Sequence, residues 1–334
     1  MDILAISSSM NLGDGWLLFL DEETVSEATF SGVDNGQIEE IIRDFVEQEE
    51  FKGTLGEIKG LHLVGETGPR KLILAGLGTR ADLTLEKLRQ VTAKALKEGE
   101  RLKAGELTIL PVRSQEIPIT HGVRAVVEAA ILTSYRFDKY LVEKKELHLK
   151  KLKIAYEPSN EAEVLRGVRD GKILGEATAL ARDLVNEPAN VMTPARLAEE
   201  ARQVGKQSGF VVEVLEEPQI EALGMKAFLE VGRASQNRPR LIVMRYYGDE
   251  GDGEKVLGLV GKGLTYDSGG LSIKSKDSMP TMKYDMAGAA AVIGAMSAIA
   301  KLNLKINVVA VVAACENLVS GTGYRPGDVV ETMA

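Results

Sequence analysis

Short apolar runs alternate with longer helix-like segments along most of the chain. Four such runs lie in the first half, namely GWLLFLD (15–21), GLHLVGE (60–66), KLILAGLG (71–78) and GELTILPV (105–112). Between and after them, segments 83–104 and 123–140 carry apolar residues at helical spacing. This alternation predicts βαβ units, and therefore an α/β fold built on mostly parallel sheet.

The chain is long enough for two domains, because it has 334 residues. The run KLKIAYEPS (151–159) predicts a closing strand that ends in a Pro-Ser-Asn breaker, so we place the boundary near residue 158. We expect a smaller N-terminal α/β domain over 1–158 and a second α/β domain over 159–334. A helical pattern from 160 to about 185 is long enough to act as a semi-rigid connector.

The second domain continues the alternation of helices and strands. Thr193 and Pro194 are typical N-cap and first-turn residues, and they predict a helix over 193–209. A further helix is expected from Met286 to about Leu302. Strands are predicted at FVVEVL (210–215), RLIVMRYY (240–247), KVLGLVG (255–261) and KINVVAVVAACEN (305–317). We expect a mostly parallel central sheet flanked by helices.

Composition and charge exclude several classes of protein. The net charge is −8 and no long basic run occurs, which disfavours nucleic acid as a partner. No apolar run approaches the ~20 residues of a membrane span, and the first residues lack signal-peptide features. These features predict a soluble, cytoplasmic protein without membrane partners. Cys315 is the only cysteine, so no intrachain disulfide forms, and the three histidines lack metal-pair spacing.

Two glycine motifs suggest nucleotide binding but lack the required context. GLGTRA (76–81) follows a strand and matches G-x-G-x-x-A, yet the next helix starts only near Thr84. No second strand ends in an acidic residue about 20 positions later. GKG (261–263) lacks the Ser or Thr and the helix that follow a P-loop lysine. A tight βα turn is the favoured interpretation of GLGTRA.

The stretch VGKGLTYDSGGLSIKSKDSMPTMKYDMAGAAAV (260–292) crowds lysines and carboxylates among glycines. Lys262 follows a predicted strand, and open α/β sheets bind ligands at the carboxyl ends of their strands. Asp285 comes just before a helix that is rich in small residues. Small residues allow close packing of that helix on the sheet, so we expect Asp285 to approach Lys262.

Each charged residue of this stretch also has a structural explanation. Lys262 is compatible with a solvated loop, Asp267 with an Asx turn, Lys274 with the polar face of an edge strand, and Asp285 with an N-cap. Together, however, they favour a binding site, since charges near a dry sheet end must pair or bind a cation.

Hard divalent cations suit these residue types. Carboxylates bind Mg²⁺ and Mn²⁺ and accept Zn²⁺. A lysine binds a metal only as the neutral amine, which burial and the field of the metal both favour. A second lysine, Lys274, would keep its proton and polarise a substrate carbonyl or stabilise an oxyanion.

The motifs VGKGLTYDSGGLSIK and MKYDMAGAAAV strongly resemble the leucyl aminopeptidase (cytosol aminopeptidase) family of dinuclear metallopeptidases. RDLVNEPANVMTP, CEN and YRPGDVV are also similar to its catalytic domain. The resemblance is specific from about residue 170 onward, and before residue 160 only the general architecture agrees.

The resemblance implies a metal-dependent aminopeptidase that releases N-terminal residues, with a leucine-type preference, from peptide substrates. It implies two divalent metal ions, Zn²⁺ or Mn²⁺ with Mg²⁺ as an alternative, and attack by a metal-activated water. Lys262, Asp267 and Asp285 would be metal ligands, with Asp267 bridging the two ions. Lys274 would be the catalytic lysine, and Met282 would line the pocket for the first side chain. The family is typically a homohexamer.

The family's second signature, NTDAEGR, does not occur before Ala334. We therefore expect residues 1–334 alone to have little or no peptidase activity, and a non-catalytic binding or assembly protein of the same fold is the alternative. Glu316 and Glu331 are not expected to replace the missing ligands. We also expect the sheet to end at DVVETMA (328–334) with an unpaired edge.

Overall fold

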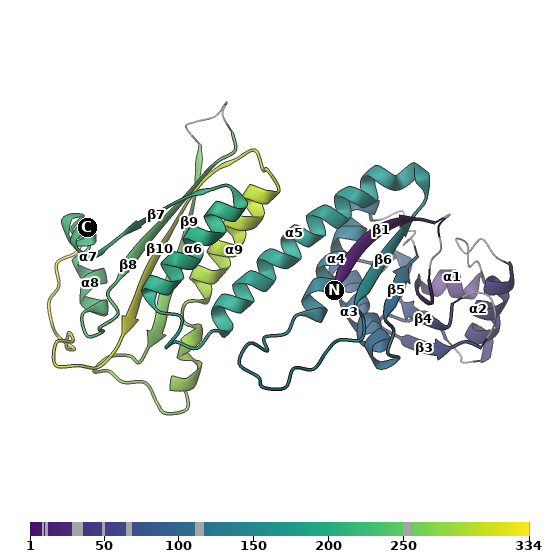
Figure 1. Cartoon of the computed structure of the whole chain (residues 1–334), viewed down its shortest axis with the longest axis horizontal. Helices are drawn as coiled ribbons and strands as arrows, with labels where there is room; N and C mark the ends of the chain where they lie inside the picture. Colours follow the sequence, from purple (N-terminus) through teal and green to yellow (C-terminus); the bar gives the residue numbers. More distant parts are fainter. Residues whose placement is uncertain are drawn as a thin grey trace. The chain divides into compact units, whose positions relative to one another are not determined.

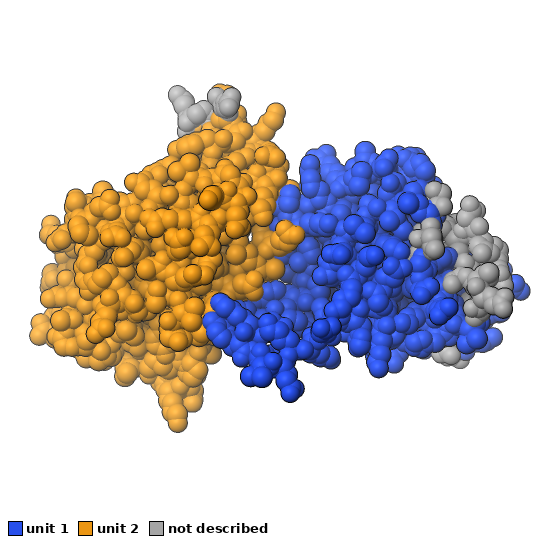
Figure 2. Space-filling view, viewed as in Figure 1, with its two compact units in different colours: residues 1–175 blue, residues 176–334 orange. Residues whose placement is uncertain are grey.

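The computed structural model describes residues 1–8, 10, 13–28, 36–48, 51–64, 69–110, 117–249, 251 and 255–333. The chain forms two compact units, residues 1–175 and residues 176–334 (Figure 2). Each unit has its own sheet and hydrophobic core, which confirms the α/β class. None of the helices in these ranges combines the length and the hydropathy that a bilayer crossing requires.

The first unit is built on a six-stranded sheet in the order β1-β6-β5-β2-β4-β3 (Figure 1). Its neighbouring strands are parallel, except that β3 runs antiparallel to β4. The strands are β1 (Asp2–Ser7), β2 (Gly15–Leu20), β3 (Ile58–His62), β4 (Lys71–Gly76), β5 (Glu106–Ile109) and β6 (Lys151–Tyr156). The predicted strands at 60–66 and 105–112 extend into residues 65–66 and 111–112, which lie outside the described residues.

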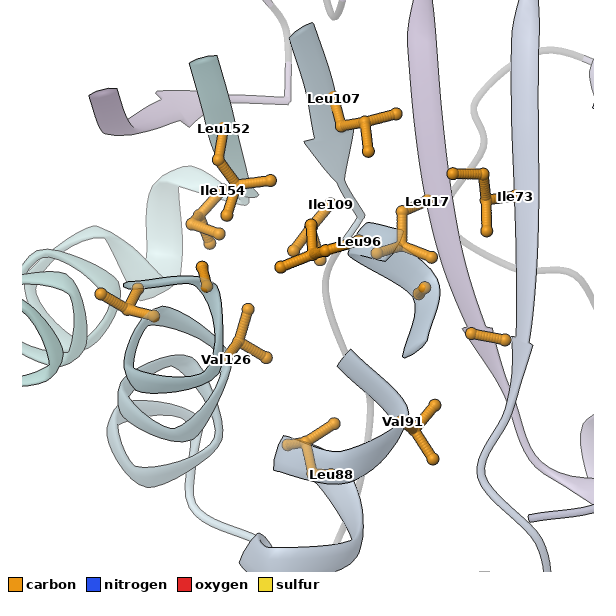
Figure 3. Packing of buried hydrophobic residues seen from close by; sticks show 14 of the residues in the cluster. Leu17, Ile73, Leu88, Val91, Leu96, Leu107, Ile109, Val126, Leu152 and Ile154 are labelled. Carbon is orange, nitrogen blue, oxygen red and sulfur yellow. The ribbon is translucent and has the colours of Figure 1, made fainter. Parts of the chain in front are cut away.

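Both faces of this sheet are buried, so its strands carry continuous apolar runs. Alternate residues of β2 and β4 enter two separate clusters: Leu17 and Ile73 face one, Leu18 and Leu72 the other. Figure 3 shows the first cluster, in which strand residues face Leu88, Val91 and Leu96 of α3 and Val126 of α4. The helices are α1 (Glu22–Ser26), α2 (Gly36–Gln48), α3 (Leu85–Arg101) and α4 (Ile119–Ser134), with a 3₁₀ turn η1 (Arg80–Asp82).

The second unit contains a four-stranded mixed sheet in the order β7-β8-β10-β9. Parallel pairing holds for β10 and β9, whereas β8 joins β7 and β10 antiparallel. Helices α6 and α9 pack their apolar residues against one face of the sheet (Figure 1). The elements are α6 (Pro194–Ser208), β7 (Val211–Leu215), α7 (Glu217–Ala222), α8 (Lys226–Gly232), β8 (Arg240–Tyr247), β9 (Val256–Asp267), η3 (Met279–Tyr284), α9 (Ala287–Lys301) and β10 (Asn307–Asn317).

One long helix, α5 (Glu161–Asn186), runs through the point where the two compact units divide. The predicted boundary near residue 158 falls between β6 and α5, within the short 3₁₀ turn η2 (Pro158–Asn160). The division into compact units instead falls inside α5, after residue 175. The first part of this helix therefore belongs to one unit and its last part to the other.

The expectation for the C-terminal segment was wrong. Residues 328–333, the described part of DVVETMA, form no strand. Asp328 instead closes a turn by accepting a hydrogen bond from the backbone N–H of Arg325, and Gly327 has a φ of 96°, which a strand cannot accommodate. The edge strands of this sheet are β7 and β9, and β9 leaves Val256, Leu257 and Val260 exposed.

Candidate metal centre

The candidate site lies at the carboxyl end of the parallel pair β9 and β10. Lys262 lies opposite Ala313, and Asp267 lies opposite Asn317, so both strands end together. The GKG motif (261–263) lies inside β9, which excludes a P-loop at this position. Because parallel strands deliver their last residues to one edge of a sheet, Asp267 and the loop after it are held beside the end of β10.

Helix α9 packs very close to β9 because both elements carry small residues. A Cβ atom at Gly261 would lie only 2.8 Å from the Cα atom of Ala289, and one at Gly288 would lie 3.1 Å from the backbone nitrogen of Lys262. The start of the helix, and Asp285 just before it, are thereby held next to Lys262. The small-residue pattern predicted this approach, and the structure confirms it.

Lys262 and Asp285 form an ion pair. The distance from Lys262 Nζ to Asp285 Oδ1 is 2.9 Å. The second oxygen, Asp285 Oδ2, is buried and has no hydrogen-bond partner among the described residues. The alternative explanation of Asp285 as an N-cap is wrong, because Met286 takes that position without a side-chain cap. A buried carboxylate oxygen without a partner is costly, and a cation would compensate it.

The Lys262 side chain is 56% exposed, which differs from the burial expected for a neutral amine. The reason is its position on the edge strand β9, where no further strand among the described residues covers it. A cation bound beside Lys262 would act on this amine through its own field.

Asp267 is the most firmly held carboxylate of the site. Its Oδ1 accepts hydrogen bonds from the backbone N–H of Gly269 at 3.0 Å and from Asn317 Nδ2 at 2.8 Å, while Oδ2 lies 3.1 Å from Lys274 Nζ. Burial raises the pKa of Asp267, but the hydrogen bonds from Gly269, Lys274 and Asn317 outweigh it and hold the pKa below its ordinary value. The Asx turn anticipated at this residue is present, together with the lysine contact.

Lys274 returns to Asp267 because the intervening loop folds back. Gly269 has a φ of 86°, and a Cβ atom there would lie 2.5 Å from the carbonyl oxygen of Ser272. The backbone N–H of Lys274 then donates to the carbonyl oxygen of Ser268 at 2.9 Å. The positive φ favours glycine, so the glycine at position 269 allows the loop to place Lys274 beside Asp267.

Met282 and Lys283 lie in η3, between the loop and α9. Met282 is half-buried, and Lys283 Nζ donates to the carbonyl oxygen of Asn186 at 2.8 Å. Lys276 and Asp277 are exposed. The structure thus forms two ion pairs, Lys262 with Asp285 and Lys274 with Asp267, and it holds Lys283 in a separate contact.

The other candidate groups are committed elsewhere. Glu316 is buried and accepts hydrogen bonds from Ser235 Oγ and Asn237 Nδ2. Glu331 pairs with Lys226. Burial, with smaller contributions from Asp267 and Glu316, raises the pKa of the Cys315 thiol to about 12, so it is no nucleophile at neutral pH.

The GLGTRA turn holds a protein carboxylate where a phosphate would bind. The backbone N–H of Arg80 donates to both Glu23 oxygens, at 3.2 and 3.1 Å, and its guanidinium binds Asp21. Gly78 N–H donates to the carbonyl oxygen of Gly53 at 2.8 Å. Because these backbone donors already bond to groups of the protein, we assign the turn a structural role and not a phosphate-binding one.

The donor set fits a hard divalent cation better than a softer one. In the described parts of the chain, no three His, Cys, Asp or Glu side chains cluster as a complete metal site. The set offers instead two carboxylates, one with an unpartnered oxygen, and two lysines. Asn317, which binds Asp267, was not among the predicted site residues. Its sequence signals are its place in the CEN motif (315–317) and its position at the end of a buried strand.

Comparisons with known proteins match both parts of the chain to one family. Residues 17–144 match the N-terminal domain of the cytosol aminopeptidase family, and residues 179–334 match its catalytic domain. A probable cytosol aminopeptidase of Clostridium perfringens is 47% identical over 306 residues, covering 91% of this chain and 62% of that relative. One of Rickettsia felis is 36% identical and covers 100% of this chain and 67% of the relative.

Solved structures show the same fold. The bottromycin maturation enzyme BotP in complex with Mn has a TM-score of 0.78 at 30% identity, covering 96% of this chain and 63% of that one. A mutant of tomato leucine aminopeptidase has a TM-score of 0.82 at 27% identity, covering 99% and 66%. The chain spans about two thirds of the length of these proteins.

Proposed function

Because the chain belongs to the cytosol aminopeptidase family, we propose that the protein is a metal-dependent aminopeptidase acting on the N-terminal residues of peptides, with a leucine-type preference. The observation that carries the proposal is the pairing of Lys262, inside β9, with Asp285, and of Asp267, at the end of β9, with Lys274. These are the residues that the resemblance to the family implies as metal ligands and catalytic lysine.

Lys262, Asp267 and Asp285 would hold the cation, with Asp267 shared between two ions. Asp285 would offer its unpartnered oxygen, and Asp267 would hold the cation while its Oδ1 stays bonded to Gly269 and Asn317 and its Oδ2 faces Lys274. The cations would be Zn²⁺ or Mn²⁺, with Mg²⁺ as the alternative, and BotP in complex with Mn supports a manganese-compatible donor set. When bound, such ions supply Lewis-acid activation of a water and of a carbonyl.

Lys274 would act as the electrostatic catalyst. Its ammonium faces Asp267 at the edge of the site, and its side chain is 32% exposed, so it is accessible from the solvent side. A fixed positive charge beside a scissile carbonyl stabilises the oxyanion as it forms. Met282, half-buried in η3, would line the pocket for the first side chain of the peptide.

The protein would work in the cytoplasm as a homohexamer, by similarity to the family. The resemblance to the family supports this assembly. Size-exclusion chromatography with light scattering tests it, and a monomer would contradict it.

Hydrolysis of a leucyl amide by the complete protein, with and without Mn²⁺, tests the function. We expect metal-dependent release of leucine that a chelator removes, and a loss of about 10²–10³ in kcat for Lys274→Met. Lys276→Met is the matched control, because Lys276 is an exposed lysine two residues away. Equal activity of both variants would refute the role of Lys274. Metal binding without hydrolysis by the complete protein would favour the non-catalytic alternative.

A further inference from the structure

Asn317 lies at the end of β10 and joins the site to the neighbouring strand. The residue is buried, with 8% of its surface exposed. Its side-chain amide donates from Nδ2 to Asp267 Oδ1 at 2.8 Å. Its backbone carbonyl accepts from Ser268 N–H at 2.9 Å and from Ser268 Oγ at 2.8 Å. Asn317 therefore fixes both Asp267 and the first residue of the loop.

A β-bulge brings these two side chains to the same face of the sheet. Up to Cys315 the pairing is regular, with Cys315 opposite Leu264, and then the register shifts so that Asn317 lies opposite Asp267. If the register did not shift at Thr265, regular pairing would place Asn317 opposite Tyr266. Because side chains alternate between faces, Asp267 would then point away from Asn317.

Asn317 and its neighbour Glu316 bind different partners, because successive residues of a strand point to opposite faces of the sheet. Glu316 turns to Ser235 and Asn237, in the segment before β8, and takes no part in holding Asp267. Two adjacent residues at the end of β10 thus have different roles: Asn317 holds Asp267, and Glu316 binds the segment before β8. Bulges commonly redirect a side chain beside an active site.

We propose that Asn317 is a positioning residue for the metal centre. By engaging Oδ1 of Asp267, it fixes the orientation of the carboxylate that would hold the cation. Ligating carboxylates are held by such outer hydrogen bonds, whose loss typically weakens metal affinity 10–100-fold. This inference rests on the proposed function, since it concerns the same metal centre.

The test compares two asparagines of the same strand. Asn307, at the other end of β10, is also buried and binds Asp249 through both ends of its side-chain amide. Mn²⁺ binding to residues 1–334 is measured by water-proton relaxation for the unaltered chain, Asn317→Ala and Asn307→Ala. We expect about 10-fold weaker binding for Asn317→Ala and unchanged binding for Asn307→Ala.

The outcomes separate the inference from the proposed function. If the unaltered chain binds no Mn²⁺, the metal centre is refuted, and the role of Asn317 with it. If both variants bind as tightly as the unaltered chain, the metal centre stands and the role of Asn317 is overturned. If both lose affinity equally, the effect is general destabilisation and the inference is again overturned. Thermal unfolding identifies folded samples, and Asn317→Ser replaces Asn317→Ala if the alanine variant does not fold.

Discussion

Two carboxylates, the buried Asp21 in the first unit and the half-buried Asp285 in the second, differ in how completely their oxygens are hydrogen-bonded. Asp21 follows β2 and uses both oxygens: Oδ2 accepts from Arg80 Nε at 2.9 Å, and Oδ1 accepts from Arg80 Nη2 at 3.0 Å and from Thr24 N–H at 2.6 Å. Asp285 uses one oxygen for Lys262 and leaves the other without a partner among the described residues.

The positively charged partners of these two aspartates, Arg80 and Lys262, also differ in how completely they bind a carboxylate. An arginine remains charged and binds a carboxylate with two parallel hydrogen bonds, so the Asp21–Arg80 pair is complete in itself. A lysine is a single point of charge that can lose its proton when a metal competes for it. A saturated pair therefore marks structure, and a half-satisfied pair marks a place for a ligand. The predictions below test this distinction, from the largest expected effect to the smallest.

Metal affinity should separate the two aspartates most strongly. Asp285→Asn should weaken Mn²⁺ binding more than about 100-fold, because even outer hydrogen-bond partners are worth 10–100-fold. Asp21→Asn should leave it unchanged. Water-proton relaxation with Mn²⁺ measures both variants. Comparable losses in the two would show that saturation of the carboxylate does not identify the site.

The free energy of unfolding in the absence of metal should show the opposite order, with the larger loss for Asp21→Asn. Asp21→Asn removes the charge from a complete pair, and we expect it to lower the free energy of unfolding by about 1 kcal/mol. The value lies at the low end because the Arg80 side chain is 41% exposed and solvent screens the pair. Asp285→Asn should change it by less than about 0.5 kcal/mol, since one of its oxygens gains nothing in the folded state.

Urea denaturation measures this difference, with Trp16 as the probe of the first unit. Trp16 is the only tryptophan, lies in β2 and is buried. Circular dichroism follows the whole chain. A larger loss for Asp285→Asn than for Asp21→Asn would break the comparison.

The smallest effect is a dependence on acid pH. Burial raises the pKa of Asp21, but hydrogen bonds from Arg80 and Thr24 outweigh it and hold the pKa below its ordinary value of 3.8. The ionised form therefore stabilises the fold at neutral pH, and this contribution falls as the pH drops below about 5 and through the folded pKa. The difference between the unaltered chain and Asp21→Asn should accordingly shrink on acidification. A constant difference in Trp16-detected stability between pH 7 and pH 3 would contradict the lowered pKa.

Local sequence patterns were sufficient for most of the fold. Apolar runs located β2, β4, β6 and β8, and the spacing of apolar residues located α3. The sequence patterns did not predict β1, because its apolar run is short and half-exposed. The end of the chain was misassigned because its valines suggested a strand, while Pro326 and Gly327 stop one.

The site was predictable where neighbours in sequence determine it. The small residues of α9 predicted the approach of Asp285 to Lys262. Asn317 was missed because its role depends on the register between β9 and β10, and an extra residue such as Thr265 leaves no mark in either strand's own pattern. The exposure of Lys262 was missed for a similar reason, since an edge position is a property of the sheet.

The close approach of α9 to β9 limits which sequences can keep this centre working. A single methyl group added at Gly261 would collide with the helix backbone at 2.8 Å and would have to push it outward. The spacing between the amine and the acid would widen although neither had been changed. The distance between Lys262 and Asp285 thus depends on the absence of a side chain at Gly261. Alanine at this position should therefore damage the metal centre as much as the loss of a ligand.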